Sequence, residues 1–186
     1  MRHVLWRFFV NYEKEETRLN EMSAKGLALT DFFFCRYSFL DSASGEYIYR
    51  IDLLEHTPVH PESKKYLNFM AESGAEHILS WFRWVYFRRK SESGSFDIYS
   101  DIDSRIAHYK RISMLMLCIS IMEFCIGTSQ VGFVLNSVLL GKPLAWYFVN
   151  LLTLVLTWSL GALLLSVWNS VRKKVKKLKQ EKNVWE

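Results

Sequence analysis

Cysteine is scarce in this sequence, and its three cysteines, Cys35, Cys118 and Cys125, form no recognisable pair. No CxxC motif occurs, and Cys118 and Cys125 lie about two turns apart on one predicted helix, too far to bridge each other. This pattern is typical of a chain whose thiols stay reduced. Met1–Val10 is short and aromatic and runs directly into a polar helix, so no secretory signal peptide is expected.

Catalytic and cofactor-binding patterns are also missing. No Ser, Cys or Lys can be paired with a base by its spacing, so we expect no enzyme activity and no cofactor. Four metal-ligating residues lie close together in the sequence, Glu55, His56, His60 and Glu62, and on a helix His56 and His60 would share one face. Pro58 and Pro61 exclude that helix. We therefore expect a solvated loop at this position and no metal.

The excess of basic residues is confined to one part of the chain. The full sequence has a net charge of +5, yet residues 1–104 contain 13 Lys or Arg against 16 Asp or Glu, and residues 169–186 carry 7 against 2. Nucleic-acid binding needs clustered Lys and Arg on the binding face. The acidic N-terminal part is therefore not expected to bind nucleic acid, although its aromatic segment invites comparison with sheets that stack RNA bases.

Two long apolar runs, Ile112–Val134 and Trp146–Trp168, organise the second half of the sequence. Each has about the 20 residues that a helix needs to cross the hydrocarbon layer of a bilayer. A helix is also the one element that satisfies its own backbone hydrogen bonds within a single lipid-exposed segment. We therefore predict a transmembrane helical hairpin over residues 112–168, followed by a basic tail over residues 169–186.

The orientation of this hairpin follows from the distribution of basic residues. Arg105, Lys110 and Arg111 precede the first run and seven basic residues follow the second, whereas the connecting loop contains only Lys142. Basic residues remain on the cytoplasmic side of a membrane. We expect a multi-pass protein of the plasma membrane with both termini in the cytoplasm.

One carboxylate, Glu123, lies near the middle of the first apolar run. An ionisable group at that depth is costly and is a functional candidate by default. Thr157 and Trp158 lie at a similar depth in the second run and are its predicted hydrogen-bond partners. The favoured interpretation is a hydrogen bond that stabilises the hairpin or an oligomer. The alternative is a proton or ion role, as in an accessory subunit of a membrane transporter.

The N-terminal region, residues 1–90, alternates between strand and helix patterns in the order β-α-β-β-α-β. The strand patterns cover His3–Phe9, Leu29–Leu40, Glu46–Leu53 and Glu76–Lys90, and the helix patterns cover Tyr12–Lys25 and Glu62–Ser73. The second and third strands are predicted to form a β-hairpin around the loop Asp41–Gly45. This order predicts an α+β domain with a ferredoxin-like split βαβ fold, in which two helices cover one face of a four-stranded antiparallel sheet. Residues 91–111 are expected to form a linker and a juxtamembrane helix. No internal repeat is evident.

The last predicted strand carries large apolar side chains on both of its faces. A sheet that is covered by helices on one side should present polar residues on the other. Something is therefore expected to cover the second face: the segment 91–104, a second protomer, a partner protein or the membrane surface. Trp81, Arg83 and Trp84 are the residues that we predict to contact a partner.

Several short motifs in the first 111 residues resemble a bacterial family of unknown function, DUF2812. They are Tyr12-Glu13-Lys14-Glu15-Glu16, Leu19-Asn20-Glu21-Met22, Lys25-Gly26, Arg36-Tyr37, Gly45-Glu46-Tyr47, Tyr49-Arg50, Asp52, Gly74-Ala75-Glu76, Arg83-Trp84-Val85-Tyr86-Phe87-Arg88, Tyr99-Ser100-Asp101 and His108-Tyr109. The resemblance covers roughly residues 5–111 and implies a cytoplasmic domain tethered to the membrane of a Gram-positive bacterium, often encoded beside a PadR-type regulator. It implies no activity and no catalytic residue.

These features together predict a membrane-anchored cytoplasmic interaction module in regulation or envelope-stress signalling. Its expected partners are the lipid bilayer and either another protein or a second copy of the chain.

Overall fold

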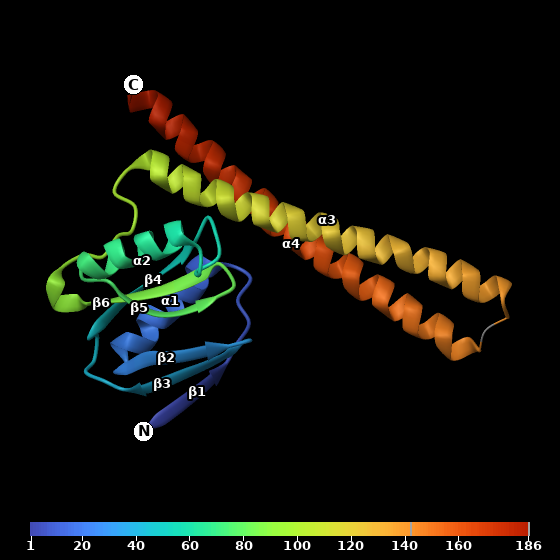
Figure 1. Ribbon diagram of the computed structural model, residues 1–186, viewed down its shortest axis with the longest axis horizontal. Helices are drawn as coiled ribbons and strands as arrows, with labels where there is room; N and C mark the ends of the chain where they lie inside the picture. The colour runs from blue at the N-terminus through green and yellow to red at the C-terminus, as the bar shows by residue number, and fades with distance from the viewer. Residues whose placement is uncertain (142, 186) are drawn as a thin grey trace. The chain divides into compact units, whose positions relative to one another are not determined.

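The chain divides into two compact units in the computed structural model, which describes residues 1–141 and 143–185 (Figure 1). The first unit, Met1–Asp101, contains all the strands, and the second begins at Ile102 and consists of two long helices. Lys142, the basic residue of the predicted connecting loop, lies outside the described residues.

The first unit is an α+β domain with two separate sheets. Its elements are β1 (Arg2–Trp6), α1 (Tyr12–Ala24), β2 (Leu27–Phe33), β3 (Arg36–Asp41), β4 (Tyr47–Leu53), α2 (Pro61–Glu72), β5 (Glu76–Trp81), β6 (Trp84–Lys90) and a 3-10 turn, Ser91–Ser93. The strands form two three-stranded antiparallel sheets, in the orders β1-β3-β2 and β4-β6-β5. The α+β class is confirmed. The ferredoxin-like fold is not, because it requires a single four-stranded sheet.

Two tight turns account for most of this difference. Phe33 pairs with Arg36, and Trp81 pairs with Trp84, so a two-residue turn closes each hairpin. The prediction of one long strand over residues 29–40 and another over residues 76–90 was therefore wrong. The turns were missed because neither contains Gly, Asn or Pro to mark it. The hairpin predicted across residues 41–45 was also wrong, since β4 pairs with β6 in the other sheet.

The two sheets are built from a duplicated β-α-β-β unit. β1-α1-β2-β3 forms one sheet and β4-α2-β5-β6 forms the other, and in both the last strand is central. Gly74 follows Gly26 by 48 residues, and Phe82 follows Phe34 by the same interval. All four residues have a positive φ. The expectation of no internal repeat was therefore wrong. The repeat is hard to detect in the sequence because the two halves share few identities beyond Leu19-Asn20-x-Met22 and Leu67-Asn68-x-Met70.

Two hydrophobic cores lie on opposite faces of the β4-β6-β5 sheet. The first packs α1 between both sheets and contains Leu19, Met22, Leu29, Tyr37, Phe39, Tyr49, Ile51 and Tyr86. The second contains Val85 and Phe87 of β6, Met70 of α2, and Phe96 from the segment after β6. The second face of the last strand is therefore covered in part by the segment after β6, which was one of the predicted alternatives. It is also covered by α2, which was wrongly predicted to share a face with α1.

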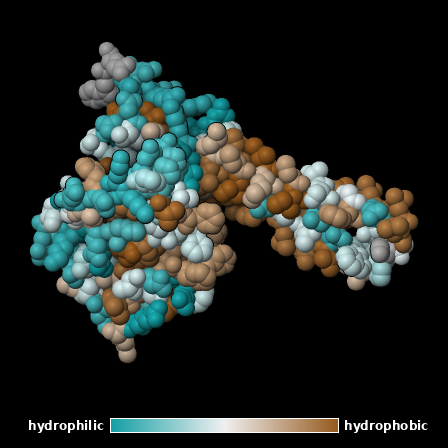
Figure 2. Space-filling model, viewed as in Figure 1, coloured by the Kyte–Doolittle hydropathy of each residue, from teal (hydrophilic) through white to brown (hydrophobic). Residues whose placement is uncertain are grey.

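The second unit is an antiparallel pair of helices, α3 (Ile102–Leu139) and α4 (Leu144–Trp185). Both are long and apolar enough to cross a membrane, and in their most apolar 18-residue windows only 17% and 6% of residues are buried. A core helix of a soluble protein would be mostly buried. Figure 2 shows apolar side chains along much of this hairpin and hydrophilic ones towards the C-terminal end of α4.

Close contact between α3 and α4 depends on glycine. A Cβ atom on Gly127 would lie 2.2 Å from the Trp158 ring, and one on Gly161 would lie 3.3 Å from the Phe124 ring. The Ser120 hydroxyl donates a hydrogen bond to the carbonyl of Gly161, at 2.9 Å. Small residues at such a crossing let two helix backbones approach closely.

Candidate functional site

The turns of the two hairpins expose aromatic side chains. Phe34 and Phe82 occupy the first turn position of each hairpin, with φ of 37° and 57°, and 67% and 85% of their surfaces are exposed. Positive φ costs a residue with a Cβ atom roughly 1–2 kcal/mol, and Asn or Gly is the usual occupant. These two phenylalanines therefore strain the backbone and bury little surface, a combination that is typical of functional positions.

The two turns lie side by side in the first unit. The Phe33 ring of β2 meets the Trp81 ring of β5 edge-on, with centroids 5.7 Å apart. Phe33 is itself mostly exposed. We call Phe33, Phe34, Trp81, Phe82 and Arg83 the hairpin-tip surface.

The residues predicted to contact a partner lie at or beside this surface. Trp81 and Trp84 are half-buried, and the Trp84 ring packs against the Tyr12 ring at 5.6 Å. Arg83 donates a hydrogen bond from Nε to the carbonyl of Leu54, at 2.8 Å, which holds the turn to the end of β4. These three side chains therefore support the surface. Its most exposed members, Phe34 and Phe82, were not predicted, because each lies in a turn that contains no turn-forming residue.

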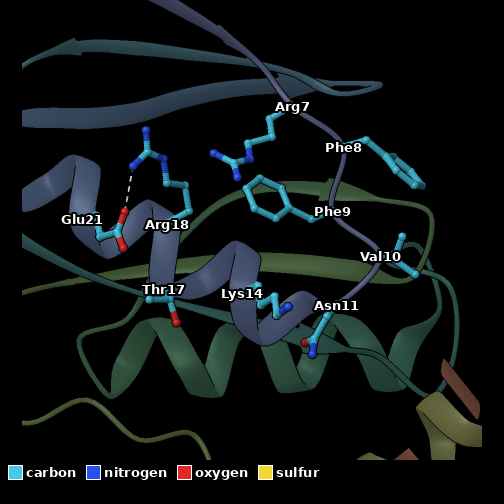
Figure 3. A pocket seen from close by; sticks show the side chains of 9 residues that line it. All are labelled: Arg7, Phe8, Phe9, Val10, Asn11, Lys14, Thr17, Arg18 and Glu21. Atoms are coloured by element: carbon cyan, nitrogen blue, oxygen red, sulfur yellow. Dashed lines mark hydrogen bonds and ion pairs between the residues drawn. The ribbon is translucent and has the colours of Figure 1, made fainter. Parts of the chain in front are cut away.

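A groove of about 520 Å³ opens next to the hairpin-tip surface (Figure 3). The amide of Arg7 donates to the carbonyl of Cys35, at 2.8 Å, so the segment after β1 begins beside the first turn. The groove lies between this segment and α1. Its lining residues are Arg7, Phe8, Phe9, Val10, Asn11, Lys14, Thr17, Arg18 and Glu21.

The groove is positively charged although the domain around it is acidic. Three cations, Arg7, Lys14 and Arg18, face a single carboxylate, Glu21, which accepts a hydrogen bond from Arg18 at 2.7 Å. Figure 3 shows the Arg7 and Arg18 side chains extending towards the same region beside the Phe9 ring. Concave positive surfaces focus the field and attract carboxylates or phosphates. Aromatic and cationic side chains together suit a ligand that is both apolar and acidic.

A buried carboxylate links α1 to both sheets. Glu15 is buried, and its Oε1 accepts hydrogen bonds from the hydroxyls of Tyr37 at 2.8 Å and Tyr86 at 2.6 Å. Burial raises the pKa of Glu15, and the two tyrosine hydrogen bonds oppose that rise. Burial and the neighbouring carboxylate also raise the pKa values of Tyr37 and Tyr86. Because this cluster is closed off within the first core, we assign it a structural role.

The carboxylate of the helical hairpin, Glu123, is half-buried near the middle of α3. The Thr157 hydroxyl donates within its own helix, to the carbonyls of Thr153 and Leu154, and a hydrogen bond from Glu123 to its oxygen stays a prediction. The Trp158 ring packs edge-on against Phe124, with centroids 6.2 Å apart. A functional role for Glu123 stays a prediction.

The structure brings together two histidines of the predicted loop and Glu62 from the first turn of α2. His56, His60 and Glu62 each offer one metal-ligating atom, and these atoms lie within 4.8 Å of one another. Pro58 and Pro61 do exclude a helix over residues 56–60, as predicted, but the turn that replaces it also clusters the two histidines.

Comparison with known proteins identifies a family. The model of a family described as a protein of unknown function, DUF2812, matches residues 11–121. The match runs from the start of α1 into α3 and so continues ten residues beyond the predicted limit of the resemblance, at residue 111. No curated protein and no solved structure matches the chain. Because the matched region covers more than half of the sequence, the chain belongs to the DUF2812 family.

Proposed function

We propose that this protein is a membrane-anchored interaction module whose N-terminal domain binds an acidic, apolar segment of a partner protein. The observation that carries the proposal is the pair of exposed phenylalanines at positive φ, Phe34 and Phe82, beside a basic groove. The fold does not need aromatic residues at these turns, since Asn or Gly would relieve the strain. A binding role explains why large apolar side chains stand there.

The chemistry of the partner follows from the two parts of this surface. Aromatic and arginine side chains dominate the binding energy of protein interfaces, and the hairpin-tip surface supplies both. The groove adds Arg7, Lys14 and Arg18, which complement carboxylates and fix the orientation of the bound segment. A regulatory protein with a short acidic segment that contains Leu or Phe fits this surface.

The membrane part of the proposal places α3 and α4 across the plasma membrane with both termini in the cytoplasm. Its support is the large apolar surface of both helices together with the basic residues that flank them. In water, an exposed apolar surface of this extent would cause aggregation. The hairpin would keep the N-terminal domain at the inner face of the membrane. Confinement there would raise the local concentration of a partner that lies at the same face.

Site-specific photocrosslinking tests the partner surface. A photoreactive phenylalanine analogue replaces Phe82 in the full chain in cells, and the same analogue replaces Phe69, another exposed phenylalanine, on α2, as the control. We expect a discrete protein adduct from position 82 and none from position 69. The adduct should fall at least about tenfold in the double variant Arg7→Glu, Arg18→Glu, because two attractive charge pairs become repulsive.

Charge reversal on the other helix provides the matched control for that variant. Lys64→Glu with Lys65→Glu, exposed on α2, changes the net charge equally and should leave the adduct unchanged. Adducts with lipid alone at position 82, or equal protein adducts from positions 82 and 69, would overturn the proposed surface.

Cysteine labelling tests the membrane orientation. In a chain with Cys35, Cys118 and Cys125 replaced by serine, single cysteines are introduced as Ala43→Cys in the first unit or Leu140→Cys at the start of the loop between the helices. A membrane-impermeant maleimide added to intact cells should label position 140. Position 43 should react only after permeabilisation, since the basic flanks remain inside. Labelling of position 43 from outside would contradict the orientation.

A further inference from the structure

The segment between β4 and α2 gathers three metal-ligating side chains that the proposed function does not use. Nε2 of His56 lies 3.1 Å from Oε2 of Glu62, and the rings of His56 and His60 stack with centroids 4.1 Å apart. One ligand atom from each of the three lies within 4.8 Å of the others. All three side chains are at the surface, half-buried or exposed, and accessible to an ion.

The backbone holds these side chains in place before any ion binds. The amide of His60 donates to the carbonyl of Thr57, at 3.0 Å, and closes a turn that includes Pro58. Pro61 begins α2, at a position where its fixed φ suits the first helical turn. Two prolines therefore restrict the loop, and a restricted loop loses little conformational entropy when a ligand binds.

Helix capping explains only part of this arrangement. Nδ1 of His60 accepts the amide hydrogen of Glu62, at 3.3 Å, and so caps α2. That bond leaves Nε2 of His60 available, and it does not require His56 to stack on the same ring. Capping therefore does not account for the stacking of the two rings, whose centroids lie 4.1 Å apart.

We propose that His56, His60 and Glu62 bind one divalent transition-metal ion, with zinc as the reference case. Two imidazole nitrogens and one carboxylate oxygen are a ligand set that zinc accepts at about 2.0–2.2 Å, with a fourth position left for water or another donor. Mg²⁺ and Ca²⁺ prefer sites made of oxygen atoms and fit this set poorly. Ligand atoms of a tetrahedral zinc site lie about 3.4 Å apart. Closing the site therefore requires the ligand atoms to move together from within 4.8 Å and the two stacked rings to rotate until their nitrogens point to one ion.

The position of the site matches the duplication of the domain. In the first β-α-β-β unit, the segment between the first strand and the helix lines the basic groove. In the second unit, the corresponding segment carries the histidine cluster. Both candidate sites thus use the same junction of the repeated unit, and loops on a repeated scaffold can diverge without disturbing the cores.

Cobalt and zinc titration of the full chain tests the site. Tag-free protein in detergent is stripped with a chelator and titrated with Co²⁺, whose visible spectrum reports tetrahedral nitrogen ligands, and Zn²⁺ then displaces it. We expect one equivalent to bind, with affinity at least about tenfold weaker in His56→Ala and in Glu62→Gln, as expected for loss of one ligand. His60→Asn should weaken binding similarly while keeping α2 capped, because Asn is a good N-cap residue.

The control is His77→Ala, which removes a histidine of β5 outside the cluster and should leave the titration unchanged. Lowering the pH below the imidazole pKa range should release the metal, since bound histidine must be neutral. Failure of Co²⁺ and Zn²⁺ to bind the unmodified chain at 100 equivalents, or unchanged binding in all three cluster variants, would overturn the proposal. The spectroscopic readout does not involve the hairpin-tip surface, so this result is independent of the proposed function.

Discussion

Replacing Glu15 with leucine is expected to destabilise the N-terminal domain by about 2–5 kcal/mol. The carboxylate is the shared acceptor of the Tyr37 and Tyr86 hydroxyls, and each buried hydroxyl left without an acceptor costs about 1–3 kcal/mol. The measurement is urea unfolding of the detergent-purified chain, followed by near-ultraviolet circular dichroism. Glu21→Leu, an exposed position of the same helix, should change stability by less than about 1 kcal/mol.

Glutamine at position 15 separates the charge of this group from its hydrogen bonds. Burial raises the pKa of Glu15 in the folded domain above its ordinary value of 4.5, so the folded state binds the proton more tightly than the unfolded chain. The stability that this group contributes is therefore fully present below about pH 4.5 and is lost as the pH rises through the folded-state pKa. Glu15→Gln keeps an acceptor oxygen and carries no charge.

The pH dependence of unfolding tests this difference. The glutamine variant should gain stability relative to the unmodified chain as the pH is raised from 4.5 to 8. Unfolding midpoints of the two proteins that stay parallel across this range would contradict the raised pKa. Glu16, whose pKa burial also raises, is present in both proteins and cancels in the comparison.

Replacing Gly127 with valine is expected to separate α3 from α4. A Cβ atom at this position would lie 2.2 Å from Cδ1 of Trp158 and 2.7 Å from Oγ1 of Thr157, far inside contact distance. Overpacking of this kind costs about 1–3 kcal/mol even where neighbours can move, and more where they cannot. The measurement is unfolding of the purified chain in mixed micelles with increasing SDS.

A second glycine of the same helix provides the control. A Cβ atom at Gly132 would meet nothing within 4 Å, so Gly132→Val should leave the SDS midpoint nearly unchanged. The double variant Gly127→Val, Trp158→Ala should recover part of the lost stability, because it removes the ring that the new side chain meets. Equal effects of valine at both glycines would show that loss of glycine, and not the helix crossing, sets the stability.

Local features of this protein could be predicted from the sequence. The helices predicted at residues 12–25 and 62–73 correspond to α1 and α2, because their periodicity, their flanking glycines and Pro61 act within a few residues. The two apolar runs lie within α3 and α4, because a long apolar run is likewise a local feature of the sequence. Family membership also followed from short motifs in order along the chain.

Strand pairing and the candidate sites were decided only by the tertiary structure. The Phe34–Cys35 and Phe82–Arg83 turns carry no turn-forming residue, and the pairing of their flanking strands imposes the positive φ of their first residues. Division into two sheets, covering of β6 on both faces and the groove beside α1 all depend on contacts between residues distant in sequence. Long-range pairing chooses among alternatives that local propensity leaves nearly equal in energy, so only the folded chain distinguishes them.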